Sequence, residues 1–221
     1  MVAGLFVVFE GPDGSGKGTV IAAVEKAIRN WNKHQNITLT REPTHKAKEL
    51  AKMLKSESDP MAGARKMTQL FVEDRKQHYH EEIKPDLVKK RVVLCDRYSI
   101  STLVYQSVQG LPINELVAAH VDANIGAPDI IFYLALEPEE ALRRIAKRGQ
   151  QIEKFEQPEF IKKVVQQHEL VYAQALDEGS PISKLLGRVV KINANLSPDE
   201  VAKAILDVLE PIYRQRAENR V

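Results

Sequence analysis

Apolar residues gather in five short segments of the chain, and these segments predict β-strands. Four of them are nearly continuous aliphatic and β-branched runs: 5–9 (LFVVF), 91–96 (RVVLCD), 129–136 (DIIFYLAL) and 188–193 (RVVKIN). Because these runs do not alternate between apolar and polar residues, they are typical of parallel strands that are covered on both faces. The segment 36–40 (NITLT) predicts a weaker fifth strand.

Helical patterns lie between the predicted strands. After the first strand, apolar residues recur at helical spacing, so that one helix face carries Val20, Ile21, Val24, Ile28 and Trp31. Near the C-terminus, Ser197 precedes Pro198 and two acidic residues, which is the pattern of a helix start. The alternation predicts an α/β fold with a parallel five-stranded sheet, in which ligands bind at the carboxyl ends of the strands.

Size and composition indicate a single domain over residues 1–221. Of the 221 residues, 43% are hydrophobic, which is enough for one α/β core. The net charge of +2 does not indicate a nucleic-acid-binding surface, and no apolar run has the ~18 residues of a membrane helix. We expect the N-terminus to be a strand and not a signal peptide. The single cysteine, Cys95, is expected in the core, and we expect a reducing, cytoplasmic setting.

A glycine-rich loop links the first predicted strand to the first predicted helix. Its sequence GPDGSGK, residues 11–17, fits the pattern G-x-x-x-x-G-K in the strand-to-helix context that this motif requires. Backbone N–H groups of such a loop and the following helix N-terminus bind phosphate oxygens, and the lysine reaches the terminal phosphates. We therefore expect a nucleotide phosphate site made of Gly11, Pro12, Asp13, Gly14, Ser15, Gly16, Lys17, Gly18 and Thr19.

Gly18 stands where this loop usually carries a serine or threonine that binds magnesium. The same GKGT sequence occurs in the adenylate kinases, whose fold is related to the one predicted for this chain. In those enzymes Mg²⁺ is held largely by water and phosphate oxygens. Mg²⁺ readily keeps several waters in protein sites. We expect Asp96, at the end of the strand 91–96, to hold Mg²⁺ through a water.

Four further motifs follow the loop: 40–44 (TREPT), 70–78 (LFVEDRKQH), 96–106 (DRYSISTLVYQ) and 143–156 (RRIAKRGQQIEKFE). In this order and spacing the chain resembles the thymidylate kinases, which phosphorylate dTMP with ATP. The resemblance extends from about residue 6 to the KINANLSPDEV segment near the C-terminus. It implies a P-loop NTPase fold with a mobile lid, ATP and Mg²⁺ as cofactors, and a homodimer.

The resemblance also implies how the base and the sugar of dTMP are held. Phe71 would stack on thymine, and Arg75, four residues further on the same helix face, would bond the base oxygen. Asp13 would bond the 3′-hydroxyl of the deoxyribose. Tyr105 would close the space beside C2′ and so disfavour ribonucleotides.

Other residues of the acceptor site follow from the same resemblance. Arg97 matches the arginine that grips the acceptor phosphate, and a planar guanidinium can bridge donor and acceptor phosphates. Arg41 and Glu42 match a loop that helps to seat the acceptor. Thr102 lies where the family places a polar residue near the edge of thymine, with Gln106 as a neighbouring candidate.

The charged segment at about 143–157 is expected to be a mobile lid, with Gly149 as a hinge. Family members carry an additional catalytic cation either in the phosphate loop or in the lid. Gly14 leaves the loop position neutral, so this chain resembles the second kind, with Arg143, Arg144, Lys147 and Arg148 in the lid. We expect phosphoryl transfer to depend on four cations: Lys17, Arg97, Arg144 and Arg148.

Two other functions remain open from the residues alone. A kinase of the same fold for another deoxynucleotide or nucleoside is compatible with Thr102 and with the unusual continuation YQSVQG. A nucleotide-binding switch without transfer activity would keep the phosphate loop, but the presence of Arg97 and Arg75 argues against it. The HYHEE segment, 78–82, lacks the spacing of a helical zinc pair, so we expect it to be solvated.

Overall fold

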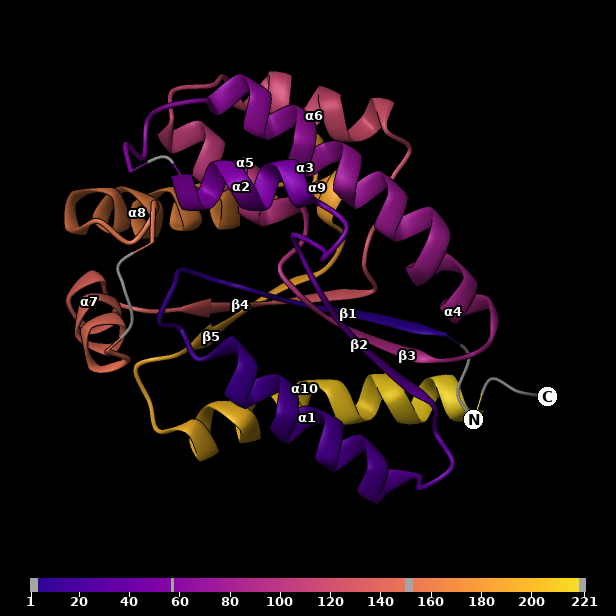
Figure 1. Ribbon diagram of the computed structural model, residues 1–221. Helices are drawn as coiled ribbons and strands as arrows, with labels where there is room; N and C mark the ends of the chain where they lie inside the picture. The colour runs from indigo at the N-terminus through magenta and orange to yellow at the C-terminus, as the bar shows by residue number, and fades with distance from the viewer. Residues whose placement is uncertain (1–3, 57, 150–152, 219–221) are drawn as a thin grey trace.

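A five-stranded parallel sheet forms the centre of the protein. The computed structural model describes residues 4–56, 58–149 and 153–218. The strand order is β2-β3-β1-β4-β5 (Figure 1). Each of the five predicted segments, the weaker one included, forms one of these strands: β1 (Leu5–Glu10), β2 (Ile37–Arg41), β3 (Val92–Asp96), β4 (Ile130–Ala135) and β5 (Val189–Asn193). The predicted α/β fold is therefore confirmed.

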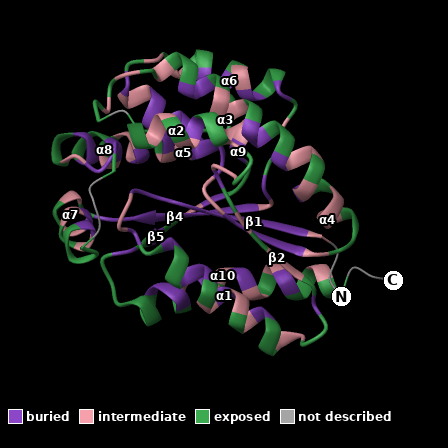
Figure 2. Ribbon diagram, viewed as in Figure 1, coloured by how far each residue is buried: buried purple, intermediate pink, exposed green. Residues whose placement is uncertain are grey.

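Successive side chains of the central strands enter two different hydrophobic cores. In β1, Phe6 and Val8 belong to one core, whereas Leu5, Val7 and Phe9 belong to the other. All five are buried. Figure 2 shows the buried residues along the sheet and on the helix faces that meet it. Burial on both faces explains why this strand is apolar throughout and does not alternate with polar residues.

Helices cover both faces of the sheet (Figure 1). One layer consists of α1 (Lys17–Trp31) and α10 (Pro198–Glu218). The opposite layer contains α2 (Lys48–Ser56), α3 (Ala64–His78), α5 (Ser99–Val108), α6 (Ile113–Asp122), α8 (Pro158–Ala175) and α9 (Pro181–Leu186). Helix α4 (Lys84–Val88) leads into β3, and α7 (Pro138–Lys147) follows β4. The predicted face of α1 is buried except at Trp31, which is partly buried and packs on Tyr213.

A π-helical turn, η1 (Tyr79–Ile83), joins α3 to α4. It contains most of the segment 78–82, for which the sequence predicted a solvated face. This prediction is wrong for His78, which is 2% exposed and hydrogen-bonds to Glu42. The acidic residues of the segment are on the surface, where they pair with Lys46.

Helix α10 begins after Ser197, where the sequence predicted a helix start, and its first turn carries a capping box. The hydroxyl oxygen of Ser197 accepts a hydrogen bond from the N–H of Glu200 at 3.4 Å, and the Glu200 carboxylate accepts one from the N–H of Ser197 at 3.0 Å. These bonds satisfy N–H groups that have no partner within the helix. None of the described helices combines the length and the apolar character needed to cross a membrane.

We predict that Ser197→Ala lowers the free energy of unfolding by about 1 kcal/mol, because the first turn of α10 loses its cap. Denaturant unfolding followed by circular dichroism measures the change. Lys203→Ala, on the same helix, is the control, and its effect should stay within about 0.5 kcal/mol because it removes only an exposed ion pair. Equal losses in the two variants would contradict a specific capping role.

Candidate active site

Three neighbouring strands end at the same level of the sheet. The parallel register pairs Asp96 of β3 with Phe9 of β1 on one side and with Arg41 of β2 on the other. The segments that follow these strands therefore leave the sheet side by side. They are the phosphate loop after β1, the TREPT segment after β2 and the DRYS segment after β3. Their side chains meet at the carboxyl edge, where the fold class predicts a ligand site.

The phosphate loop has the backbone conformation that its glycines permit. Gly14 and Gly16 lie in the left-handed region, with φ of 82° and 85°, and Gly16 caps the N-terminus of α1. The side chain of Lys17 folds back over the loop, and its Nζ donates hydrogen bonds to the carbonyls of Gly11 and Pro12, both at 3.1 Å. The loop and its lysine are thus arranged around a common centre at the start of a helix.

The environment of Lys17 favours an anionic ligand. Burial, followed by the nearby charge of Arg97, lowers the pKa of the Lys17 ammonium to about 8. An anion placed beside two such cations would be attracted to both and would raise the pKa of the lysine again. Beside the lysine, a Cβ atom added at Gly18 would meet no atom within 4 Å, so the start of a side chain fits at this position.

Arg97 connects the phosphate loop to α5. Its Nη2 lies 2.5 Å from a carboxylate oxygen of Asp13, and its Nη1 donates to Ser101 at 3.1 Å. Although burial raises the pKa of Asp13, the charges of Arg97 and Lys17 hold it below its usual value. The backbone of Arg97 has a φ of 70°, which a non-glycine residue rarely adopts. Arg97 is therefore held beside the phosphate loop as an ionised group with a fixed orientation.

A cavity of about 200 Å³ opens beside Arg97. Its walls include every residue that the sequence assigned to the acceptor nucleotide: Asp13, Arg41, Glu42, Phe71, Arg75, Arg97, Thr102, Tyr105 and Gln106. These residues come from the phosphate loop, β2 and its following loop, α3, the segment after β3, and α5. The tertiary structure thus gathers onto one surface side chains that are up to 93 positions apart, from Asp13 to Gln106.

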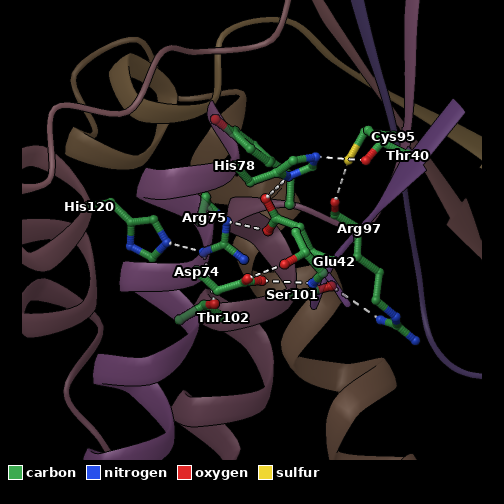
Figure 3. Close-up of polar contacts among 12 residues, drawn as sticks. Thr40, Glu42, Asp74, Arg75, His78, Cys95, Arg97, Ser101, Thr102 and His120 are labelled. Atoms are coloured by element: carbon green, nitrogen blue, oxygen red, sulfur yellow. Dashed lines mark hydrogen bonds and ion pairs between the residues drawn. The ribbon is translucent and has the colours of Figure 1, made fainter. Parts of the chain in front are cut away.

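The guanidinium of Arg75 lies at the wall of this cavity and is held by three acceptors (Figure 3). Its Nε donates to Glu42 at 2.7 Å, and its Nη1 donates to Thr102 at 3.0 Å and contacts Nε2 of His120 at 2.7 Å. Glu42 also bonds to Nδ1 of His78 at 3.0 Å. The sequence assigned Glu42 to the seating of the acceptor, and in the structure it contacts Arg75 directly.

Tyr105 joins the phosphate loop to the segment after α7. Its hydroxyl donates to Asp13 at 3.0 Å, and its ring packs edge-on against Phe155 with centroids 5.3 Å apart. Burial is the main cause that raises the pKa of the Tyr105 phenol, so the hydroxyl stays a neutral donor. Asp13 thus bonds both to Tyr105 and to Arg97 at the edge of the cavity.

Gln106 has a fixed amide orientation. Its Nε2 donates to Oε1 of Gln109 at 3.1 Å, and the Nε2 of Gln109 donates to the carbonyl of Pro60 at 2.6 Å. Because the Pro60 carbonyl can only accept, Gln109 must present its oxygen to Gln106. The Oε1 of Gln106 is buried without a partner among the described residues, in a side chain that lines the cavity. This leaves an acceptor for a ligand hydrogen-bond donor.

A second cavity, of about 510 Å³, lies on another side of the phosphate loop. Its walls combine loop residues with α7 and the segment after β5. Arg144 crosses from α7 to the loop, with Nη1 3.5 Å from the carbonyl of Gly14 and Nη2 donating to the carbonyl of Ala194 at 2.9 Å. Arg143 and Lys147 also line this cavity. Three of the four predicted lid cations therefore lie beside the phosphate loop.

The fourth predicted lid cation, Arg148, has a different partner. Its Nη2 contacts both carboxylate oxygens of Glu156, at 2.6 and 2.8 Å. Glu156 is 3% exposed and lines the first cavity together with Lys154 and Phe155. Residues 150–152 of the predicted lid lie outside the described residues. The described parts of the lid thus lie at two sites, with α7 at the second cavity and residues 153–156 at the first.

Asp96 has the environment expected for a group that contacts a metal through water. Its Oδ1 is buried and has no hydrogen-bond partner among the described residues. The described residues contain no group of three or more carboxylate, histidine or cysteine side chains that could bind a metal ion by themselves. The expectation that Mg²⁺ takes most of its ligands from phosphates and water, with Asp96 acting through a water, stays a prediction.

Two buried residues of the site were missed by sequence reasoning. Glu10, at the end of β1, accepts hydrogen bonds from the N–H groups of Tyr98 and Ser101, at 2.7 and 3.1 Å, and so anchors the start of α5. In the sequence, a charged residue directly between the apolar run 5–9 and the phosphate loop is a signal that could have marked Glu10 as a site residue. His120 lies in α6, and the sequence around it carries no such signal, because only the packing of α6 against α3 brings it to Arg75.

Known proteins resemble this chain over most of its length. A family model described as thymidylate kinase matches residues 9–205. A probable thymidylate kinase of Pyrobaculum calidifontis is 33% identical over 212 residues, which cover 93% of this chain and 96% of the relative. The thymidylate kinase of Clostridium novyi is 33% identical over 217 residues, which cover 95% of this chain and all of the relative. The thymidylate kinase of Leptospira borgpetersenii is 32% identical, with 92% of each chain covered.

We predict that Glu42→Gln lowers the free energy of unfolding by about 3 kcal/mol, because it leaves the buried charge of Arg75 without its counter-ion. Glu25→Gln is the matched control, since Glu25 pairs with Arg29 on the surface, where loss of an ion pair costs at most about 1 kcal/mol. Denaturant unfolding of both variants gives the comparison. A loss at Glu42 no larger than that at Glu25 would show that the buried pair is not needed for stability.

Proposed function

This chain belongs to the thymidylate kinase family, and we propose that it transfers the γ-phosphoryl group of ATP to dTMP, which yields dTDP and ADP. It is a nucleoside monophosphate kinase. The observation that carries the proposal is the cavity beside Arg97, because the nine residues assigned to the acceptor nucleotide line one surface next to the phosphate loop. The family also implies a homodimer in the cytoplasm, and both are part of the proposal.

The donor nucleotide would occupy the second cavity and the phosphate loop. The loop N–H groups, the N-terminus of α1 and Lys17 are placed to bind its phosphates. Arg144 lies at the carbonyl of Gly14, so its charge is already beside the loop that would hold them. We assign Arg144 as the lid cation that meets the transferring phosphoryl group.

Arg148 takes another role in this proposal. Its contact with Glu156 ties the end of α7 to the segment 153–156, which lines the acceptor cavity. To reach the transferring phosphoryl group it would have to leave this carboxylate, which is 3% exposed. An ion pair with a buried carboxylate is costly to break. We therefore replace the expectation that Arg148 is catalytic with a role in holding the lid.

The acceptor nucleotide would lie in the cavity beside Arg97. Phe71 presents a ring to the base, and Arg75 presents hydrogen-bond donors. Asp13 and Tyr105 lie at the sugar, and Arg97 lies between the acceptor cavity and the phosphate loop, where it can align the acceptor phosphate. Residues 153–156 line the same cavity, so a closing motion of this segment would bring it over the acceptor nucleotide.

Phosphoryl transfer at this site needs alignment and positive charge more than proton transfer. An anionic oxygen of the acceptor phosphate attacks the γ-phosphorus, and the bond from this phosphorus to the β-phosphate oxygen breaks, so that ADP leaves. The attacking oxygen is already anionic, so no general base is required. Fixed cations at Lys17, Arg97 and Arg144 stabilise the charge that develops on the transferring group.

Mg²⁺ fits the site as a metal held mainly by phosphates and water. Asp96 would bond one of its waters through Oδ1, which has no other partner among the described residues. Gly18 offers no ligand, although there is room for one. When bound, Mg²⁺ would neutralise phosphate charge, and Asp96 would hold one of its waters.

We predict that a coupled ADP-release assay gives the highest kcat/KM with dTMP, a lower value with dUMP, and little turnover with UMP, because Tyr105 would crowd C2′ of a ribose. A higher kcat/KM for a different nucleotide would favour a kinase with another acceptor. Absence of transfer to every nucleotide tested would favour a nucleotide-binding switch.

We predict that Lys17→Ala lowers kcat at least ~10²-fold in the same assay without unfolding the protein, because it removes a cation from the donor phosphates. A kcat close to that of the wild type would show that the phosphate loop does not bind the donor.

We predict that Asp96→Asn raises the Mg²⁺ concentration for half-maximal activity and lowers kcat by at least ~10-fold, because charge beside the metal is lost. Gly18→Ser should be folded and active, because its Cβ would meet no atom within 4 Å, and it should lower the Mg²⁺ midpoint, because it restores the residue type that usually binds the metal in this loop. Magnesium titrations of the three proteins test both effects. If Asp96→Asn changes neither kcat nor the midpoint, the metal is held elsewhere.

A further inference from the structure

We propose that His120 is a positioning residue, which fixes the guanidinium of Arg75 so that the acceptor cavity selects a pyrimidine with a carbonyl oxygen, and not an amino group, on the ring edge that faces Arg75. This inference deepens the proposed function and rests on it, because it concerns the acceptor base. His120 lies on α6 and does not line the cavity, so it acts through Arg75 (Figure 3).

The tautomer of His120 follows from its two hydrogen bonds. Its Nδ1 lies 2.7 Å from the carbonyl oxygen of Leu116, which can only accept, so Nδ1 carries the proton. Its Nε2 lies 2.7 Å from Nη1 of Arg75, which can only donate, so Nε2 presents a lone pair. A protonated ring would place two donors face to face. The imidazole is therefore a neutral acceptor.

Burial reinforces this assignment. His120 is fully buried, and its burial, followed by the charge of Arg75, lowers the pKa of the imidazole to about 3. The ring thus stays an acceptor over the whole range in which such enzymes work. A histidine with a charge change near neutral pH could not hold a guanidinium reliably, because protonation would reverse its role.

The hydrogen bonds of Arg75 divide its five N–H groups into two sets. The Nε proton goes to Glu42, and the two Nη1 protons go to Thr102 and His120. Within the part of the chain that the structure describes, no protein acceptor is assigned to the two Nη2 protons. Because Arg75 lines the cavity, these protons are the donors that remain for a ligand.

Removal of His120 would change this division. One Nη1 proton would lose its acceptor in a buried site, and a buried donor without a partner is destabilising. The guanidinium can then turn about its bond to Glu42 to recover an acceptor, which takes the Nη2 donors away from their fixed direction. When the Nη2 donors of Arg75 are fixed, they reject a base whose amino group also donates. This rejection weakens when the guanidinium can move.

Binding of dUMP and dCMP tests the proposal directly, because the two bases differ only in the oxygen or amino group on C4 and in the proton on the neighbouring N3. Calorimetry gives the dissociation constants for the wild type, His120→Phe and His120→Gln. We expect His120→Phe, which keeps a flat ring but has no acceptor, to reduce the preference for dUMP at least ~10-fold. The affinity for an ATP analogue should not change. His120→Gln, which restores an acceptor oxygen, should recover most of the preference.

His168→Phe is the matched control for a purely structural effect. His168 is also a buried histidine whose Nδ1 bonds to the carbonyl four residues earlier, Val164, at 2.9 Å, but its Nε2 has no partner among the described residues. His168→Phe also removes a buried imidazole and its bond to a backbone carbonyl, but it should not change the ratio of the two dissociation constants. A preference that falls equally in both variants would overturn the proposal.

Two further measurements keep the test decisive. If His120→Phe does not fold, His120→Leu replaces it, and the ¹⁵N shifts of the wild-type ring at pH 5–8 report the tautomer without any substitution. A ring protonated on Nε2, or unchanged selectivity in a folded acceptor-free variant, would overturn the role of His120. A wild type that binds neither dTMP nor dUMP would instead overturn the proposed function.

Discussion

Burial of the parallel sheet on both faces is the constraint on which the rest of this structure depends. Two hydrophobic cores occupy the sides of the central strands, so charged groups lie at the carboxyl edge, where the chain leaves the sheet. The strand order places β1 between β3 and β4, and the phosphate loop therefore emerges at the middle of this edge. The groups that serve the proposed chemistry are close together because both faces of the central strands are apolar and only the ends of these strands can carry polar side chains.

Charges gathered in this way must be compensated, and the protein does so with pairs and networks. Arg97 is matched by Asp13, and Arg75 by Glu42. A neutral histidine completes the shell of Arg75 without adding charge. Such networks resist rearrangement because each lost bond leaves a buried polar group. The site therefore holds its donors and cations in place before a ligand arrives, which is the condition for electrostatic stabilisation of a transition state.

The phosphate loop also separates two functions in space. One cavity lies between the loop and α3, α5 and residues 153–156, and the other lies between the loop and α7. The predicted lid segment contributes to both, through Arg144 at the cavity proposed for the donor and through Phe155 and Glu156 at the cavity proposed for the acceptor. A motion of this one segment would therefore affect both nucleotides together, which suits a reaction that must not start before both are bound.

The sequence alone predicted the five strands, the helix after the phosphate loop and the start of the C-terminal helix, and it indicated the chemical types of the site. Strong apolar runs fixed four strands, the capping pattern fixed the start of α10, and the glycine spacing fixed the phosphate loop, because each of these signals is local in the chain. The acceptor residues were found through motifs whose order resembles a family. Local patterns also misled at His78, since a polar helical segment does not reveal which of its side chains meets a buried carboxylate.

Only the tertiary structure decided which polar groups meet. The bonds of Arg75 join residues 27 to 45 positions apart, and neither the pairing with Glu42 nor that with His120 follows from spacing along the chain. The division of the lid cations between the phosphate loop and Glu156 also depends on how α7 packs. The physical reason is the same in each case: periodicity determines which face of an element is apolar, whereas the partner of a buried polar group is determined by the packing of whole elements against one another.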